Sequence, residues 1–172
     1  DFVTDDEGEW DRLAQSLGST VSSLKTRARL LRASNPLLGH RGCRVGLTFP
    51  EVYEIQARAV FEAMLDTRFE GRLQLVVPLV VCEQEFERLA RRIARIAARV
   101  SQERGEATPA YDIGPMIESP RACLIADRLA AGSDFFLFGT NDLTVATFNM
   151  HRDDAARFLP FYVEHGVLEG DP

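Results

Sequence analysis

The sequence has few of the residues on which several common kinds of site depend. Its three cysteines lie far apart without forming a Cys-x-x-Cys pair, and only three histidines are present, so a Cys/His zinc site is not expected. Cys43, Cys82 and Cys123 instead indicate reduced, partly buried thiols in a cytoplasmic protein. Because no apolar run approaches the roughly 18 residues of a membrane span, we expect no membrane-spanning segment, and we expect no signal peptide.

Positive charge and the common nucleotide-binding motifs are also lacking. The net charge is −6, so broad attraction to nucleic acid or to an anionic membrane is not expected, although a local cationic pocket is compatible with it. No Ser-His-Asp order, Walker loop or dinucleotide-binding fingerprint occurs. The 172 residues, 45% of them hydrophobic, suffice for one domain with a core. The chain begins at Asp1 rather than Met, which indicates processing or an excerpt.

The hydrophobic pattern predicts two leading helices followed by alternating strands and helices. The leading helices are expected at 5–16 and 20–33, and a first strand–helix unit is expected to begin near residue 43. The other predicted helices span 51–69, 83–103, 120–131 and 153–165, and the other predicted strands span 75–81, 113–118 and 135–142. In helix 83–103 one face is apolar and the other carries five arginines, which we interpret as a solvated outer face rather than a phosphate-binding surface.

This alternation predicts the α/β class with a parallel sheet. Alternation alone does not separate an open doubly wound sheet from a (β/α)₈ barrel. About four strand–helix units in this length would be half of a barrel, whose full size is about 250 residues. Half a barrel leaves two sheet edges unpaired, so missing strands, a partner or self-association is expected.

Glu118 and Asp142 are the first candidates for chemistry, because each follows a predicted buried strand. Acidic side chains at the carboxyl ends of successive parallel strands lie on the same rim of the sheet. Such a pair can hold a hard divalent cation and leave its other positions to water and an anionic substrate. The alternative is that each acid only begins the next helix, where carboxylates are favoured.

Three further segments place polar groups near the same rim. Arg41 lies among glycines and can bind phosphate or carboxylate in a bidentate manner, unless the segment is a plain structural turn. Gly139–Asp142 gathers a hydroxyl, an amide and a carboxylate, unless it is a turn that caps a helix. Arg152 is a second candidate cation, the alternative being an ion pair with the aspartates that follow it.

Several motifs together resemble one family. They are Asn35–Arg44 (NPLLGHRGCR), Met116–Ala122 (MIESPRA) and Phe138–Thr144 (FGTNDLT), followed by Arg152–Asp154. They closely resemble the phosphoenolpyruvate (PEP)-binding domain of PEP-utilising enzymes, which include pyruvate, phosphate dikinase, phosphoenolpyruvate synthase and enzyme I of the sugar phosphotransferase system. The first motif, the 50–59 helix and the two leading helices look most like the dikinase branch.

The resemblance implies a fold and a domain organisation. The fold is a partial (β/α)₈ TIM barrel of about four β/α units with two leading helices. The whole chain, 1–172, would be a single domain and the central portion of the barrel. Residues 1–34 would be a helical insertion and residues 35–172 the β/α units. We also expect a homo-oligomer.

The resemblance also implies a site. Mg²⁺ would be held by Glu118 and Asp142, and phosphoenolpyruvate or pyruvate would bind there. The catalytic residues would be Arg41, Asn141 and Arg152. The substrate would be bound by these three together with Glu118, Thr140 and Asp142.

The implied activity is Mg²⁺-dependent exchange of a phosphoryl group between phosphoenolpyruvate and a histidine on a separate swivelling domain. That domain and the ATP-binding domain of the family are absent from this chain. The family usually has Thr, Ser and Gln where this chain has Pro115, Leu137 and Val145, and each change removes a polar group near the expected site. One alternative is therefore a non-catalytic relic of the barrel that acts as a ligand-binding or interaction module. Another is a Mg²⁺-dependent lyase of the pyruvate-enolate type, which the clustered arginines and Asn141 match less well.

Overall fold

The computed structural model describes the backbone of residues 6–31 and 38–172, and their side chains except those of Leu31, Arg152 and Asp153. The chain divides into two compact units, Asp1–His40 and Arg41–Pro172.

The first unit contains two helices, α1 (Glu7–Ser16) and α2 (Val21–Leu31), as the sequence predicts for the described residues. The Asp6 carboxylate accepts a hydrogen bond of 2.9 Å from the N–H of Gly8 and thereby caps α1. Lys25 of α2 forms an ion pair with Glu7 and lies over the ring of Trp10, 5.9 Å from its centroid. These contacts link the two helices.

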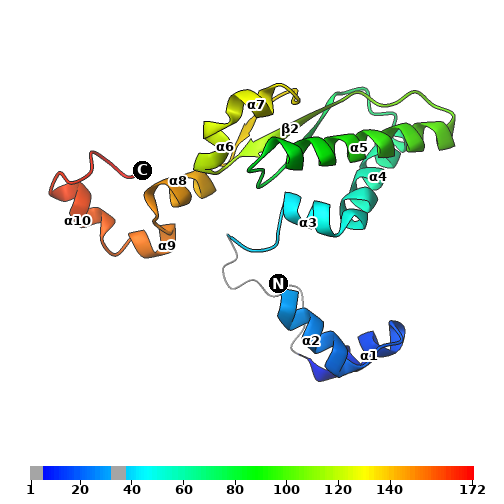
Figure 1. The fold of residues 1–172 in the computed structure, drawn as a ribbon, viewed down its shortest axis with the longest axis horizontal. Coiled ribbons are helices and arrows are strands. Elements are labelled where there is room, and N and C mark those ends of the chain that lie inside the picture. The colour runs from blue at the N-terminus through cyan, green and yellow to red at the C-terminus, as the bar shows by residue number, and fades with distance from the viewer. Residues whose placement is uncertain (1–5, 32–37) are drawn as a thin grey trace. The chain divides into compact units, whose positions relative to one another are not determined.

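In the second unit, strands and helices alternate (Figure 1). In chain order the elements are α3 (Cys43–Thr48), α4 (Pro50–Asp66), β1 (Leu73–Val77), α5 (Glu83–Arg104), β2 (Tyr111–Ile117), α6 (Pro120–Leu124), α7 (Ala126–Ala130), β3 (Leu137–Phe138), α8 (Thr140–Phe148), α9 (Arg152–Ala155) and α10 (Leu159–Glu164).

The three strands form a parallel sheet in the order β1-β2-β3. The β1–β2 register runs from Leu73 opposite Tyr111 to Val77 opposite Pro115. β3 pairs with the end of β2, with Leu137 opposite Met116 and Phe138 opposite Ile117. The predicted α/β class with a parallel sheet is confirmed. Among the described residues the sheet is open.

The prediction of about four strand–helix units is wrong for the described part of the chain, which contains three strands. The segment expected to begin with a strand near residue 43 is the helix α3. Its buried residues, Cys43 and Gly46, are three positions apart, which is the spacing of one helix face and not of a strand.

Other predicted boundaries also differ. The helix predicted at 51–69 ends at Asp66, and the one predicted at 153–165 is divided into α9 and α10. β1 ends at Val77 rather than 81, because Pro78 has no N–H to donate and Leu79 has a φ of +60°. The helix predicted at 120–131 is divided into α6 and α7 at Ile125, which has a φ of −115°. The strand predicted at 135–142 contains only two paired residues before α8 begins at Thr140.

Helix α5 is the longest in the chain and agrees with its prediction. The Glu85 carboxylate accepts hydrogen bonds from the N–H groups of Val81 (2.8 Å) and Cys82 (3.2 Å), and Gly105 ends the helix with a φ of +68°. Its predicted apolar face is buried in full: Phe86, Leu89, Ile93, Ile96 and Val100. On the other face the arginines are exposed, except that Arg92 is partly buried beside Glu54 (3.5 Å).

The buried side chains form two clusters along α5. One joins α4 to α5 and contains Ala57, Phe61, Met64, Ile93, Ile96, Ala97 and Val100. The other lies towards the carboxyl ends of the strands and contains Cys43, Val77, Val80, Phe86, Leu89, Ile117, Ala122 and Leu129. This second cluster supports the segments that follow β1 and β2.

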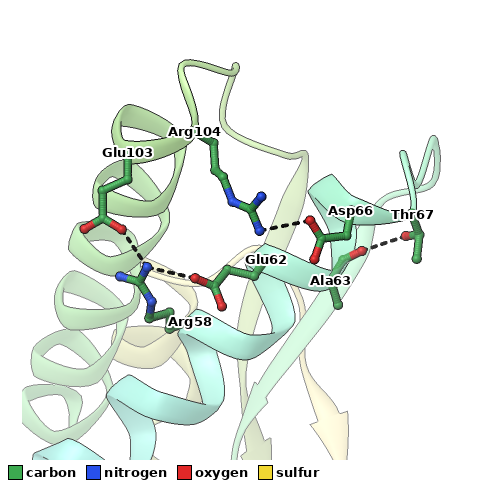
Figure 2. A network of polar contacts seen from close by, with 7 residues as sticks. All are labelled: Arg58, Glu62, Ala63, Asp66, Thr67, Glu103 and Arg104. Atoms are coloured by element: carbon green, nitrogen blue, oxygen red, sulfur yellow. Dashed lines mark hydrogen bonds and ion pairs between the residues drawn. The ribbon is translucent and has the colours of Figure 1, made fainter.

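Ion pairs connect α4 and α5 beside the first cluster (Figure 2). Arg58 contacts Glu103 at 2.6 Å and Glu62 at 2.8 Å, and Arg104 contacts Asp66 at 2.9 Å. These side chains are substantially exposed, and ion pairs of this kind contribute little to stability because water screens them. The apolar contacts therefore dominate the stability of this interface.

Replacement of Phe61 by alanine tests that conclusion. Phe61 is fully buried and its ring meets that of Tyr111 edge-on, with the centroids 5.0 Å apart. Phe61→Ala should lower the free energy of unfolding by about 3–5 kcal/mol, because it removes buried apolar surface and leaves a cavity. Ile55→Ala on the same helix, where the side chain is 68% exposed, should stay within about 0.5 kcal/mol of the original chain. Urea unfolding measures both, and equal losses would contradict this account of the core.

Candidate functional site

The carboxyl ends of the three strands bring three segments of the chain together. Pro78 and Leu79 follow β1, Glu118 follows β2 directly, and Gly139 to Asp142 follow β3. Because the strands are parallel and in the order β1-β2-β3, all three segments lie at one rim of the sheet. Glu118 follows the middle strand and therefore has a neighbour on each side.

Glu118 is a buried carboxyl group with a defined orientation. Only 5% of its surface is exposed. Its Oε1 accepts a hydrogen bond of 2.5 Å from the N–H of Leu79. The residue lies before the N-cap of α6, because Ser119 caps that helix by accepting a hydrogen bond of 3.2 Å from Ala122. Glu118 therefore does not serve to begin the next helix.

Asp142 occupies a different position from the predicted one. It lies in the first turn of α8 and not at the end of a strand. The positive end of a helix dipole favours a carboxylate there, so Asp142 does begin a helix, and this position is compatible with a role at the rim. From that turn the Asp142 carboxyl group still reaches Glu118, to which it is hydrogen-bonded.

The pKa of Glu118 reflects its burial and its closeness to Asp142. The pKa of Glu118 is raised above its ordinary value of 4.5, mainly because burial disfavours the charged form. The hydrogen bond and the negative charge of Asp142 raise this pKa further, whereas the N–H of Leu79 and the charge of Arg41 lower it. Arg41 is thus within electrostatic reach of the acidic pair.

Gly139 makes the approach of the β3 segment possible. A Cβ atom at this position would lie 2.7 Å from the Cβ of Glu118 and 3.0 Å from its Oε2. The N–H of Gly139 also donates a 3.0 Å hydrogen bond to the carbonyl of Ile117. Any larger residue would displace the Glu118 carboxyl group, so glycine is required for the two acids to meet.

The segment that contains Arg41, called the arginine segment below, is held in place through Cys43, two residues further along the chain. Cys43 is fully buried, and its N–H donates to the carbonyl of Pro78 at 3.0 Å. Its thiol donates to the carbonyl of Leu79 at 3.1 Å. Burial raises the pKa of the thiol to about 12, so Cys43 packs and positions but does not act as a thiolate.

The remaining predicted residues are only partly located. Thr140 and Asn141 are exposed in the first turn of α8, the turn that carries Asp142. The backbone of Arg152 begins α9, but its side chain lies outside the described part of the structure, so its role stays a prediction. The structure thus brings together Glu118, Asp142 and the charge of Arg41.

Three residues to which the sequence assigns no role of their own help to build the site. Leu79 orients Glu118, Gly139 provides the space, and Arg121 donates to the carbonyl of Val81 at 2.9 Å, which ties α6 to the segment after β1. A glycine at a strand end is a signal that could have been used. A leucine carries no sequence signal for a left-handed backbone.

The two carboxyl groups suit a hard divalent cation. In the described residues no three His, Cys, Asp or Glu side chains are grouped closely enough to form a metal site by themselves. Mg²⁺ does not need such a group, since it is commonly bound through one or two carboxylates with water and substrate oxygens completing its shell. The raised pKa of Glu118 marks a pair of acids that a cation would stabilise in the charged form.

Comparison with known proteins identifies what the chain resembles. The sequence model of the family described as "PEP-utilising enzyme, PEP-binding domain" matches residues 11–165.

Among the described residues, no helix is both long and apolar enough to cross a membrane.

Curated relatives include pyruvate, phosphate dikinases. The dikinase of Clostridium symbiosum is 40% identical over 176 residues, which cover 100% of this chain and 20% of the relative. That of Rhizobium meliloti is 43% identical over the same coverage, and chloroplastic dikinase 1 of Arabidopsis thaliana is 43% identical over 96% of this chain and 18% of the relative. The chain therefore spans about a fifth of the length of these relatives.

The burial of Glu118 predicts an unusual effect of pH on stability. A carboxyl group whose pKa is raised on folding binds its proton more tightly in the folded chain, so stability falls as the pH rises from about 4.5 through the folded-state pKa. Glu118→Gln removes this loss of stability and keeps a side-chain oxygen that can accept the hydrogen bond from the N–H of Leu79. The variant should therefore melt at a higher temperature than the original chain at pH 7–8, and the difference should shrink towards pH 4.

Thermal unfolding followed by circular dichroism across this pH range measures the effect. Glu70→Gln, at an exposed position, is the matched control and should not change the melting temperature. A Glu118→Gln variant that is less stable than the original chain at pH 7–8 would contradict the assignment of Glu118 as a buried, electrostatically opposed acid.

Proposed function

Because the chain belongs to the family of PEP-utilising enzymes, through their PEP-binding domain, we propose that it forms the phosphoenolpyruvate- and pyruvate-binding part of a Mg²⁺-dependent phosphotransferase similar to pyruvate, phosphate dikinase. The observation that carries the proposal is the meeting of Glu118 with Asp142 at the carboxyl rim of the sheet, within reach of the charge of Arg41. An acidic pair beside a cation suits a bound metal and an anionic substrate at once.

The metal would be held by Glu118 and Asp142. Bound Mg²⁺ supplies a positive charge that neutralises the phosphate and carboxylate oxygens of the substrate. Glu118 can act as a ligand only in its charged form, and the Leu79 N–H and Arg41 favour that form. The burial of Glu118 also keeps its carboxyl group largely away from bulk water, which strengthens its electrostatic interactions.

The substrate would be positioned by the residues around the acidic pair. Arg41 and Arg152 would bind the phosphate, for which the planar guanidinium group is well suited. Thr140 and Asn141 would offer a hydroxyl and an amide from the first turn of α8, where backbone N–H groups also favour anions. Catalysis of phosphoryl transfer rests mostly on such positioning and charge neutralisation.

The rest of the reaction would depend on parts beyond these residues. The phosphoryl group would pass between phosphoenolpyruvate and a histidine on a swivelling domain, which in turn would exchange with an ATP-binding domain. We further propose that the open sheet is part of a (β/α)₈ barrel that additional strands complete. Residues 1–34 would be a helical insertion in a single domain, and the whole protein would be a cytoplasmic homo-oligomer.

A second candidate is a non-catalytic descendant of this barrel that binds the ligand without transferring phosphate. Pro115 is fully buried in β2, and Leu137 and Val145 lie in β3 and α8. None of the three side chains offers the polar group that is usual in the family. This candidate retains the acidic pair, so it should also bind the ligand in a metal-dependent manner. It differs from the first candidate only in that it would not transfer the phosphoryl group.

Calorimetry on the native polypeptide that carries these residues tests the proposal. Phosphoenolpyruvate should bind when Mg²⁺ is present and not when EDTA removes it. Glu118→Ala and Asp142→Ala should each weaken this binding by at least about 100-fold, because a direct ligand matters more than the outer contacts that are commonly worth 10- to 100-fold. Glu87→Ala, at an exposed position of α5, is the control and should bind normally.

One result would separate the two candidate functions, and another would eliminate both. Metal-dependent binding without transfer of labelled phosphate between phosphoenolpyruvate and pyruvate would favour the non-catalytic module. Binding that ignores Mg²⁺, or that survives both alanine substitutions, would eliminate the proposed site.

A further inference from the structure

Leu79 has a backbone conformation that leucine rarely adopts. Its φ is +60°, in the left-handed region, which Cβ-bearing residues occupy at a cost. Two other described residues besides glycine, Arg68 and Asn149, also have a positive φ. Asn149 is the C-cap of α8 and Arg68 directly follows the C-cap of α4, and the left-handed conformation is common at such positions. Leu79 ends no helix, because it lies between β1 and α5. Its conformation therefore needs a different cause.

Both backbone polar groups of Leu79 are used by residues of the candidate site. Its N–H donates to Oε1 of Glu118 at 2.5 Å, and its carbonyl accepts from the Cys43 thiol at 3.1 Å. The preceding carbonyl, of Pro78, accepts from the N–H of Cys43 at 3.0 Å. One residue thus connects the acid after β2 with the segment that contains Arg41, although these are 39 and 36–38 positions away in sequence.

The arginine segment also packs directly against Leu79. A Cβ atom on Gly42 would lie 3.0 Å from the Cβ and Cδ1 atoms of Leu79 and 3.0 Å from the carbonyl of Pro78. Gly42 itself has a φ of +57°. Two residues with positive φ, from different parts of the chain, therefore fit against each other, and Arg41 is the neighbour of one of them.

We propose that Leu79 is a positioning residue: its left-handed backbone directs one polar group towards Glu118 and the other towards Cys43, and so holds the acid and the Arg41 segment in one arrangement. With φ near the usual negative values, the N–H and the carbonyl would point in other directions, and at least one of the two bonds would be lost. The effect of Leu79 on ligand binding rests on the proposed function. The positioning itself is a property of the ligand-free chain.

The side chain of Leu79 explains why the position is not simply glycine. It packs against the buried cluster that contains Cys43, Val77 and Val80. This packing offsets the backbone strain and anchors the residue. Strained residues of this kind are usually found where the surrounding structure holds them in place.

A pair of substitutions separates positioning from packing. Leu79→Ala and Leu79→Gly both remove the packed side chain, but only alanine retains the penalty for positive φ. If the left-handed backbone matters, glycine is the better replacement: its folding equilibrium constant should exceed that of the alanine variant roughly fivefold. If Leu79 only fills space, alanine should be equal or better, because glycine is the more flexible in the unfolded chain.

Hydrogen exchange in the ligand-free protein gives a readout of the bond to Glu118. The amide of residue 79 should be protected in the original chain and in Leu79→Gly, and should exchange about tenfold faster or more in Leu79→Ala. In the presence of Mg²⁺, phosphoenolpyruvate should bind about tenfold more weakly to Leu79→Ala and within about threefold of normal to Leu79→Gly, as expected when an orienting contact is loosened.

Arg68 provides the matched control. It has a φ of +49° and an exposed side chain after α4, outside the candidate site. Arg68→Gly should also be more stable than Arg68→Ala, but both should bind phosphoenolpyruvate normally and leave the exchange at residue 79 unchanged.

The possible failures are distinguishable. If the original protein shows no Mg²⁺-dependent binding of phosphoenolpyruvate, the proposed function fails, while stability and amide exchange in the ligand-free variants still test the positioning. If Leu79→Ala equals or exceeds Leu79→Gly in stability and in protection of amide 79, the positioning role is overturned whatever the ligand does.

Discussion

The parallel pairing of β2 with a strand on each side is the constraint on which the rest of the structure depends. It places the ends of β1, β2 and β3 at one rim, so that Glu118 lies between the segments containing Leu79 and Gly139. The helices α4 and α5 add the apolar contacts that a covered parallel sheet requires. Without this pairing, the acids, which are 24 positions apart in sequence, would have no reason to meet.

The site is arranged at some expense of stability. A buried carboxyl group beside a second one raises the free energy of the folded chain, and the hydrogen bond from Leu79 and the charge of Arg41 offset this only in part. Leu79 adds backbone strain at the same place. Unfavourable groups held by a well-packed scaffold are typical of functional sites, where a ligand supplies the missing interaction. The clustering of these features supports a binding role for the rim.

The sequence predicts the scaffold better than the details of the rim. Helix α5 follows from its strict apolar period, and the alternation of elements identifies the parallel sheet. The error at Cys43–Thr48 arose because a short apolar run fits either a strand or a helix. The helical position of Asp142 is one of the two positions that the sequence allows. The roles of Leu79 and Gly139 depend on contacts between segments distant in sequence, which no local pattern contains.

Glu118 and Asp142 form a crowded acidic pair, and a bound divalent cation would stabilise both in the charged form. Titration of the two side-chain carboxyl carbons by NMR, with and without Mg²⁺, tests it most directly. Without the metal, the pKa of Glu118 should lie above the ordinary value of 4.5. Saturating Mg²⁺ should lower it below that value, because a bound cation favours the charged form. A Glu118 carboxyl group that titrates normally and ignores Mg²⁺ would contradict the account.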